Sequence, residues 1–254
     1  MESKKSVFII PSRVQTSHQG YLLQACIESI QQYHPESDIV LINDCTTESF
    51  IPEIRGIQRE YVEKEYHNCG ELNAYVWACK NYDHYDRFVV IHDSTKLIKK
   101  IPFEIEKDRY YRPIWHSNYC VNADTTGEEV ENILKRFTLN VREPYEKIQQ
   151  GGYYGTGGGN MIFGAMGIFT KEFARKLSTE TNFIELAKLF HKRILRCFFE
   201  RFLFCIVYRF QDTSQFRLES LCGCIFSHGN PFKNRTPEDH AANNPYIVKC
   251  WQER

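Results

Sequence analysis

Short apolar runs alternate with longer segments of helical spacing through the first hundred residues. Continuous apolar runs, typical of strands that are buried on both faces of a sheet, lie at 7–11 (VFIIP), 38–44 (DIVLIND) and 87–94 (RFVVIHDS). Between them, apolar residues recur every three or four positions over 22–30 and 70–80, which predicts two amphipathic helices. This alternation predicts an α/β fold with a Rossmann-like, mostly parallel central sheet that is flanked by helices.

The second half of the chain has a less regular pattern. An amphipathic helix is predicted over 126–137, and the apolar run 160–169 predicts a further strand. The sequence also predicts one long helix over 182–208 and a late strand over 222–228. No repeat, linker or change of composition divides the chain, so we expect a single domain.

The overall composition is that of a globular protein without an excess of either charge. Of the 254 residues, 42% are hydrophobic and 25% are charged, which excludes a disordered chain. The 32 Lys and Arg residues equal the 32 Asp and Glu residues in number. A protein that binds nucleic acid by neutralising phosphates normally carries a basic excess, so we expect no nucleic-acid partner.

The ten cysteines are scattered through apolar segments, and the closest pair is Cys222 and Cys224. A zinc site would require CxxC pairs, and disulfide frameworks belong to short secreted chains. The start of the chain also lacks an apolar region of signal-peptide length. We therefore expect reduced, mostly buried thiols in a cytoplasmic protein.

Residues 194–210 are the only stretch that suggests a membrane. Arg196, Glu200, Arg201 and Arg209 interrupt this stretch, so we expect no transmembrane segment. A buried amphipathic helix is the favoured interpretation. The alternative is a helix at the membrane surface, because Phe and Arg together suit a lipid interface, and this would allow peripheral membrane contact.

Polar residues follow each of the three predicted strands of the first half. They are Ser12 and Arg13, then Asn43 and Asp44, and finally His92 to Thr95. Because ligands of parallel α/β sheets bind beyond the carboxyl ends of the strands, these residues predict a binding site. Asp93 leaves a buried strand there and suits a divalent metal on a diphosphate, although it could instead cap the following turn.

The segment 151–159 holds six glycines. Its spacing is not GxGxxG, and it has no Lys-Ser or Lys-Thr pair as in a Walker loop. We expect a mobile loop that closes over a substrate site and excludes water, with a structural turn as the alternative.

The order of these segments resembles the GT-A glycosyltransferases. Their nucleotide-binding half is similar in its first strand and polar loop, its second strand ending in Asn-Asp, the segment NCGELNAYVWA (68–78) and a strand ending in HDS. The segment GGGNMIFGAMGIFTKEFARKL (157–177) looks like the acceptor-side strand and helix of the family. LESLCGCIFSHG (218–229) looks like its closing helix, strand and histidine.

This resemblance implies a single GT-A-like domain over 1–254. Its nucleotide-binding half would be 6–100, and its acceptor-side half would be 101–254 with the long helix 182–208. The resemblance also implies the residues of the nucleotide site, which are Pro11, Ser12, Arg13, Asp44, Asn68, Gly70, Asn73, His92 and Ser94. Of these, Asp44 would touch the base or the ribose.

The resemblance further implies a metal site. His92, Asp93 and Ser94 occupy the position of the family's Asp-x-Asp motif, and His228 matches a distant histidine that often completes the coordination of Mn²⁺ or Mg²⁺. The chain has one carboxylate where the family usually has two. Metal dependence is therefore an expectation, with metal independence left open.

The activity implied by the resemblance is transfer of a sugar from a nucleotide-diphospho-sugar, with a UDP-sugar as the expected donor, to a glycan, protein or lipid acceptor. An inverting enzyme needs a carboxylate base near the acceptor hydroxyl, for which Glu219 is the first candidate and Asp212 the second. One alternative is a non-catalytic GT-A-like scaffold that binds sugar or nucleotide. A Rossmann-type methyltransferase is a weaker alternative, because it would need a glycine-rich turn where residues 11–20 offer only Gly20.

Overall fold

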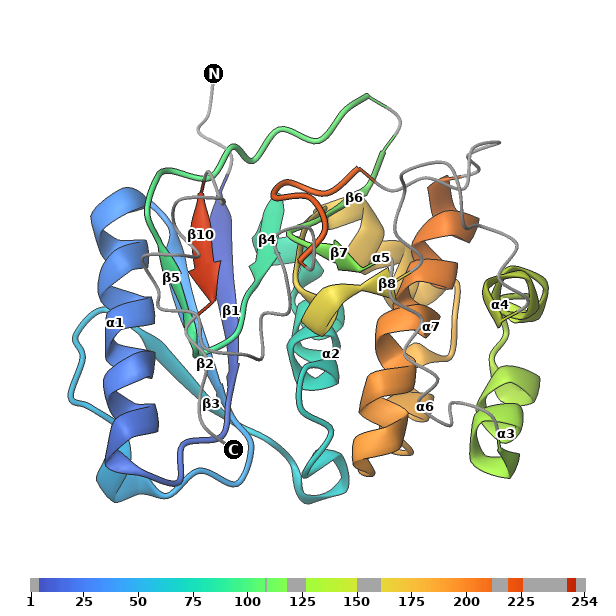
Figure 1. Ribbon diagram of the computed structural model, residues 1–254, viewed down its shortest axis with the longest axis horizontal. Coiled ribbons are helices and arrows are strands. Elements are labelled where there is room, and N and C mark those ends of the chain that lie inside the picture. The colour runs from blue at the N-terminus through green and yellow to red at the C-terminus, as the bar shows by residue number, and fades with distance from the viewer. Residues whose placement is uncertain are drawn as a thin grey trace.

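The central sheet has six strands in the order β3-β2-β1-β4-β9-β6 (Figure 1). The computed structural model describes residues 5–107, 109–117, 127–149, 161–211, 219–225 and 246–249. The strands, in sheet order, are Gln58–Tyr61, Asp38–Asn43, Ser6–Ser12, Arg87–Val90, Gly167–Thr170 and Tyr111–Pro113. The three predicted strands of the first half are therefore β1, β2 and β4.

The pairing of β1 determines where the strand ends lie. β1 is parallel to β2, with Ser12 opposite Asn43, and parallel to β4, with Ile9 opposite Val90. β2 is in turn parallel to β3. Only β9 runs against its neighbours β4 and β6. The prediction of a mostly parallel α/β sheet is confirmed, and the carboxyl ends of β1, β2 and β4 lie at one edge.

One face of the sheet is covered by α1 (Ser17–Tyr33). Leu23, Ile27 and Ile30 of this helix are fully buried against the sheet, and the hydroxyl of Thr16 caps its N-terminus by accepting the Gln19 N–H. A separate antiparallel pair, β5 (Thr95–Leu97) and β10 (Ile247–Lys249), lies on the same side. The last described strand is thus anchored beside the segment that follows β4.

The other face carries most of the helices. α2, α5, α6 and α7 pack there, and α3 and α4 lie outside α7 (Figure 1). Their bounds are Leu72–Lys80, Lys171–Thr179, Phe183–Ala187, Arg193–Gln211, Glu128–Arg136 and Arg142–Gln149. Stacked and edge-on aromatic pairs fill this layer, for example Phe198 with Phe190 and with Tyr145.

The predicted single helix 182–208 is wrong, because the chain forms α6 and then α7. Between them the amide N–H groups of Leu189 and Phe190 bond three residues back, to Leu186 and Ala187, as in a tight turn. Phe190 is fully buried and packs against Phe198 and Phe202. Burying this ring under α7 requires the chain to turn back, and the local helical spacing gives no sign of that turn.

Twelve residues of α7 are buried, so it is a core helix. This finding confirms the buried interpretation of the apolar stretch 194–210, since its aromatic face packs inside the protein and not toward a lipid surface. Within the described ranges, no helix is long and apolar enough to cross a bilayer.

Two predicted strands of the second half are corrected. The run 160–169 divides into β8 (Met161–Ile162) and β9, because Gly164 adopts a left-handed φ of 61° within a short turn, η4 (Phe163–Ala165). β8 pairs with β7 (His116–Ser117) in a small sheet. In 222–228, the described residues 222–225 form only an isolated bridge to β7. Three further turns of 3₁₀ helix are η1 (Glu48–Phe50), η2 (Lys64–Tyr66) and η3 (Tyr82–His84).

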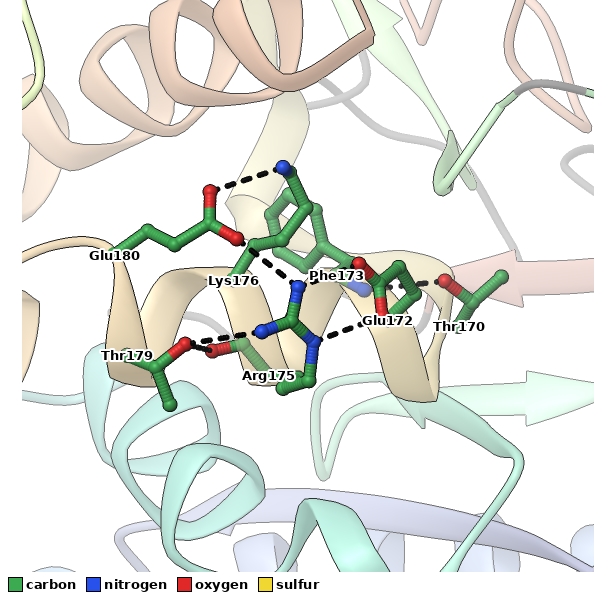
Figure 2. A network of polar contacts seen from close by, with 7 residues as sticks. All are labelled: Thr170, Glu172, Phe173, Arg175, Lys176, Thr179 and Glu180. Atoms are coloured by element: carbon green, nitrogen blue, oxygen red, sulfur yellow. Dashed lines mark hydrogen bonds and ion pairs between the residues drawn. The ribbon is translucent and has the colours of Figure 1, made fainter.

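The surface of α5 shows how exposed charges support one helix (Figure 2). The Thr170 hydroxyl caps α5 by accepting the Phe173 N–H at 3.2 Å. Arg175 bonds to Glu172 and Glu180 on the solvent side. Such pairs add a few tenths of a kcal/mol each at about one helical turn of spacing, so this network stabilises the helix locally.

The described cysteines are free thiols: Cys26, Cys45, Cys69, Cys79, Cys197, Cys205, Cys222 and Cys224. Half of them are buried, and burial raises the pKa of Cys69 and of Cys222 to about 12. Such thiols carry almost no thiolate at neutral pH and act as packing groups.

Candidate functional site

Polar side chains from β1 and β4 meet at the carboxyl edge of the sheet. The Ser12 hydroxyl, at the end of β1, donates to Oδ2 of Asp93 at 3.4 Å. Asp93 follows β4 and is partly buried, whereas Ser12 and Pro11 are buried within β1. The parallel pairing of β1 with β4 thus brings together two of the predicted site residues that are 81 positions apart.

Asp44, at the end of β2, anchors the loop that leads into α2. Its buried carboxylate accepts the backbone N–H of Asn68 at 2.7 Å, that of Gly70 at 3.0 Å and the side-chain amide of Asn73 at 3.3 Å. Asn68 and Gly70 have φ values of 65° and 58°. The resemblance assigned these four residues to one nucleotide site, and the structure brings them together, while their binding of a nucleotide stays a prediction. Their described contacts show Asp44 holding the loop, and its predicted contact with a base or ribose stays a prediction.

Two guanidinium groups flank this loop. Nη1 of Arg13 donates to Oδ1 of Asn68 at 3.0 Å. Arg196 of α7 lies against Gly70, because a Cβ built on that glycine would be 3.1 Å from both Cδ and Nη1 of the arginine. The Nε atom of Arg196 is buried without a hydrogen-bond partner. A guanidinium suits phosphate oxygens, so the loop and both arginines form a potential phosphate-binding surface.

His92 connects this edge to the turn before β9. Its Nε2 atom lies 2.8 Å from the carbonyl oxygen of Gly164 and 3.3 Å from Oε1 of Glu71. Its Nδ1 atom lies 3.0 Å from Nζ of Lys249. Because an ammonium group only donates, we assign Nδ1 as the acceptor, with the ring proton on Nε2 donated to Gly164. The ring is thus held through both of its nitrogens.

Lys249 also contacts Ser94, the residue after Asp93. β10 places it opposite Thr95, and its Nζ donates to Oγ of Ser94 at 2.5 Å. Both side chains are buried, with Lys249 8% exposed and Ser94 6% exposed. One ammonium group therefore contacts both ends of the HDS segment, His92 and Ser94.

Glu200 of α7 adds a carboxyl group near Glu71 and bonds to Gly164. Its Oε1 atom accepts the Gly164 N–H at 3.0 Å. Burial, and then the negative charge of Glu71, raise the pKa of Glu200 to about 8. A carboxyl group that gains and loses its proton near neutral pH has the property required of a general acid or base.

The structure does not bring Glu219 to this edge. Leu221 donates its N–H to the carbonyl of Pro113, and residues 221–225 then run parallel to 113–116. Glu219 therefore lies near the amino end of β6, at the opposite edge of the sheet. It is exposed there, in a shallow hollow with Arg109, Tyr111 and Arg112. It has no helix around it in the described part, contrary to the prediction. Its role as a base stays a prediction without a supporting contact.

Three predicted features lie outside the described residues. They are Asp212, His228 and the glycine-rich segment 151–159. The predicted proximity of His228 to Asp93 is therefore untested, as is the closing of the glycine-rich loop.

The described residues of the HDS segment do not fit a divalent-metal site. No group of three or more His, Cys, Asp or Glu side chains within the described ranges is arranged to hold an ion. The lone pair of His92 Nδ1 and the hydroxyl of Ser94 both face the Lys249 ammonium, which repels a second cation. Among the described motif side chains, only the Asp93 carboxylate has the ligand chemistry for Mn²⁺ or Mg²⁺.

Sequence reasoning missed Glu71, Glu200, Arg196 and Lys249 as site residues. Glu71 stands within the segment 68–78 that carried the resemblance, so its position next to Gly70 was a usable signal. Glu200 was detectable as an isolated carboxylate within an apolar helix, which the sequence treated only as an interruption. Lys249 has no local signal, because its place depends on strand pairing with β5.

Comparison with known proteins adds no family assignment. No family model matches the sequence, and no curated protein matches it. Two solved structures found as similar are those of the mannosyltransferase Ktr4p from S. cerevisiae, one of them in complex with GDP. The first is 11% identical with a TM-score of 0.40 and covers 77% of this chain, and the second is 10% identical with a TM-score of 0.43 and covers 79%.

The matched part spans 65% and 66% of those two chains, less than two thirds of their length. Likeness at this level carries no conclusion about chemistry, so the site is judged by its own residues.

Proposed function

We propose that this protein is a glycosyltransferase that moves a sugar from a nucleotide-diphospho-sugar to an acceptor hydroxyl. The observation that carries this proposal is the convergence at one sheet edge of three kinds of group. These are the guanidinium groups of Arg13 and Arg196, the carboxylate of Asp93, and the carboxyl group of Glu200, whose pKa is raised to about 8 by burial. Ligands of open α/β sheets bind at such an edge.

The donor would bind along the ends of β1 and β2. Ser12 and Arg13 offer a hydroxyl and a guanidinium there, and Asp44 keeps the loop 68–70 in the conformation that meets them. Arg196 approaches the same loop from α7. Two positive groups around one loop suit a diphosphate, with a UDP-sugar as the first donor to test and GDP- and CMP-sugars as comparisons.

The reaction needs a base that takes one proton from the hydroxyl group of the acceptor substrate. Transfer forms a bond between the acceptor oxygen and the anomeric carbon, and it breaks the bond from that carbon to the diphosphate, which leaves with the electron pair. We assign the Glu200 carboxylate to take the proton of the acceptor hydroxyl. Its raised pKa makes it a stronger base than an ordinary glutamate once it is ionised.

A sugar- or nucleotide-binding scaffold without activity is the second candidate. The HDS segment favours this candidate, because Asp93 is its single carboxylate. The ammonium group of Lys249 also contacts both His92 and Ser94. The two functions differ in whether the sugar–phosphate bond is broken.

The deciding experiment follows binding and bond cleavage separately. Thermal shifts with UDP, GDP and CMP measure binding, and mass spectrometry of a nucleotide-sugar panel measures release of the nucleoside diphosphate. We expect one nucleotide to bind and its sugar conjugate to turn over, and Glu200→Gln to keep binding while losing turnover. Binding without turnover in the wild type would support the scaffold, and absence of all nucleotide binding would refute both candidates.

A further inference from the structure

We propose that Lys249 is the cation that binds the diphosphate of the donor. This inference rests on the proposed function. It assigns Lys249 to a site that is otherwise built from residues 11–94, the turn at Gly164 and α7.

The fold holds Lys249 in place through its two neighbours in β10. Ile247 is fully buried and Val248 is 2% exposed, and both belong to the described strand that pairs with β5. The register sets Lys249 opposite Thr95, one residue after Ser94. The Ile98 N–H bonds to the carbonyl of Tyr246 at 2.8 Å and extends this pairing. The ammonium group is therefore placed by packing and backbone pairing.

The contacts of the ammonium group identify its place in the site. Its bonds to Oγ of Ser94 and Nδ1 of His92 are to the residues on either side of Asp93. Bonding to Nδ1 leaves the histidine proton on Nε2, where Gly164 accepts it. Lys249 thus orients the HDS segment and brings a positive charge to it.

The chemistry of the reaction gives this charge a use. As the sugar leaves, negative charge builds on the diphosphate, and a cation positioned in advance stabilises that charge. A lysine ammonium binds phosphate oxygens as a point charge. Because the ammonium group already faces Nδ1 of His92 and Oγ of Ser94, where it repels a second cation, we expect diphosphate to bind without an added metal.

The test uses isothermal titration calorimetry in EDTA with three probes: inorganic diphosphate, UDP and uridine. The variants are Lys249→Gln, Lys249→Arg and the matched control Lys96→Gln, an exposed lysine on the paired strand β5. We expect the wild type and Lys96→Gln to bind diphosphate and UDP without metal. Lys249→Gln should weaken both at least tenfold with uridine binding unchanged, and Lys249→Arg should retain most of the affinity.

A merely structural lysine would change uridine binding and melting temperature together with diphosphate binding. Equal diphosphate affinity in Lys249→Gln and wild type would overturn the inference. The inference would also be overturned if diphosphate binding by the wild type disappeared in EDTA and returned with Mn²⁺. This second measurement uses only the wild type, so it does not depend on a variant folding correctly. Wild type that binds inorganic diphosphate but neither UDP nor any other nucleotide would refute the proposed function while leaving Lys249 as an anion-binding residue.

Discussion

The carbonyl oxygen of Gly164 lies 2.8 Å from Nε2 of His92, although 72 positions separate the two residues. The N–H of the same glycine donates to Glu200. One turn with a left-handed φ of 61° therefore joins the segment after β4 to the helix that carries the proposed base. The two sides of the site depend on this glycine for their relative position.

Replacing Gly164 with alanine should displace His92. A Cβ there would lie 2.7 Å from Cε1 of the histidine, closer than real contacts allow, and the left-handed φ is also unfavourable for alanine. We expect a loss of about 1–3 kcal/mol in the free energy of unfolding, measured by urea denaturation, together with weaker nucleotide binding.

Gly223→Ala separates the cost of the left-handed φ from the cost of the steric contact with His92. Gly223 has a φ of 78°, but a Cβ there meets nothing within 4 Å. It should show the backbone cost alone and leave nucleotide binding intact. Equal effects of both substitutions on binding would contradict the proposed link between Gly164 and His92.

Asp44→Asn should destabilise the protein by about 2–4 kcal/mol, measured by urea denaturation. The asparagine NH₂ group would face donors that now bond to the carboxylate, leaving at least one partly buried N–H of Asn68 or Gly70 without an acceptor. The matched control is Asp38→Asn at the other end of β2, where the asparagine oxygen can still accept the Tyr85 hydroxyl and the exposed pair with Lys5 should be worth less than about 1 kcal/mol. Lost nucleotide binding at unchanged stability would instead favour the contact with the base or the ribose that the resemblance implies.

The stability of the protein should fall with rising pH because of Glu200. Its pKa is about 8 in the folded state against an ordinary 4.5. Between these values the folded chain binds more protons than the unfolded chain, so the free energy of unfolding decreases as pH rises and levels off above pH 8. The slope for one group is at most about 1.4 kcal/mol per pH unit.

Urea denaturation at several pH values from 4 to 9 tests this contribution. Glu200→Gln keeps an acceptor for Gly164 but cannot ionise, so its stability should lack this decrease. Glu180→Gln is the control, because the ion pair with Lys176 lowers the pKa of that exposed carboxylate. A wild-type profile that matches Glu200→Gln would show that Glu200 does not titrate in this range.

Asp93→Ala should lower turnover of the donor at least tenfold while the protein remains folded. The carboxylate stands at the carboxyl end of β4 beside Ser12, where the diphosphate-sugar would bind. Asp83→Ala, an exposed carboxylate before the amino end of the same strand, is the control and should retain full turnover. Undiminished turnover in Asp93→Ala would remove this residue from the site.

The sequence by itself determined the first half of the fold and the sheet edge at which its polar residues gather. Strands buried on both faces are continuous apolar runs, and such runs alternating with helices pair in parallel, so β1, β2, β4 and the polar residues after them were predictable. The grouping of Asp44 with Asn68 and Gly70 was implied by the resemblance to the GT-A glycosyltransferases.

Only the tertiary structure decided which groups complete the site. β9 runs antiparallel to β4, the chain turns at Phe190, and Glu219 lies near the amino end of β6, away from the carboxyl edge of β1, β2 and β4. Lys249 reaches His92 across 157 positions through a three-residue strand. Contacts of this kind depend on pairing and packing between distant segments, and no local periodicity records them.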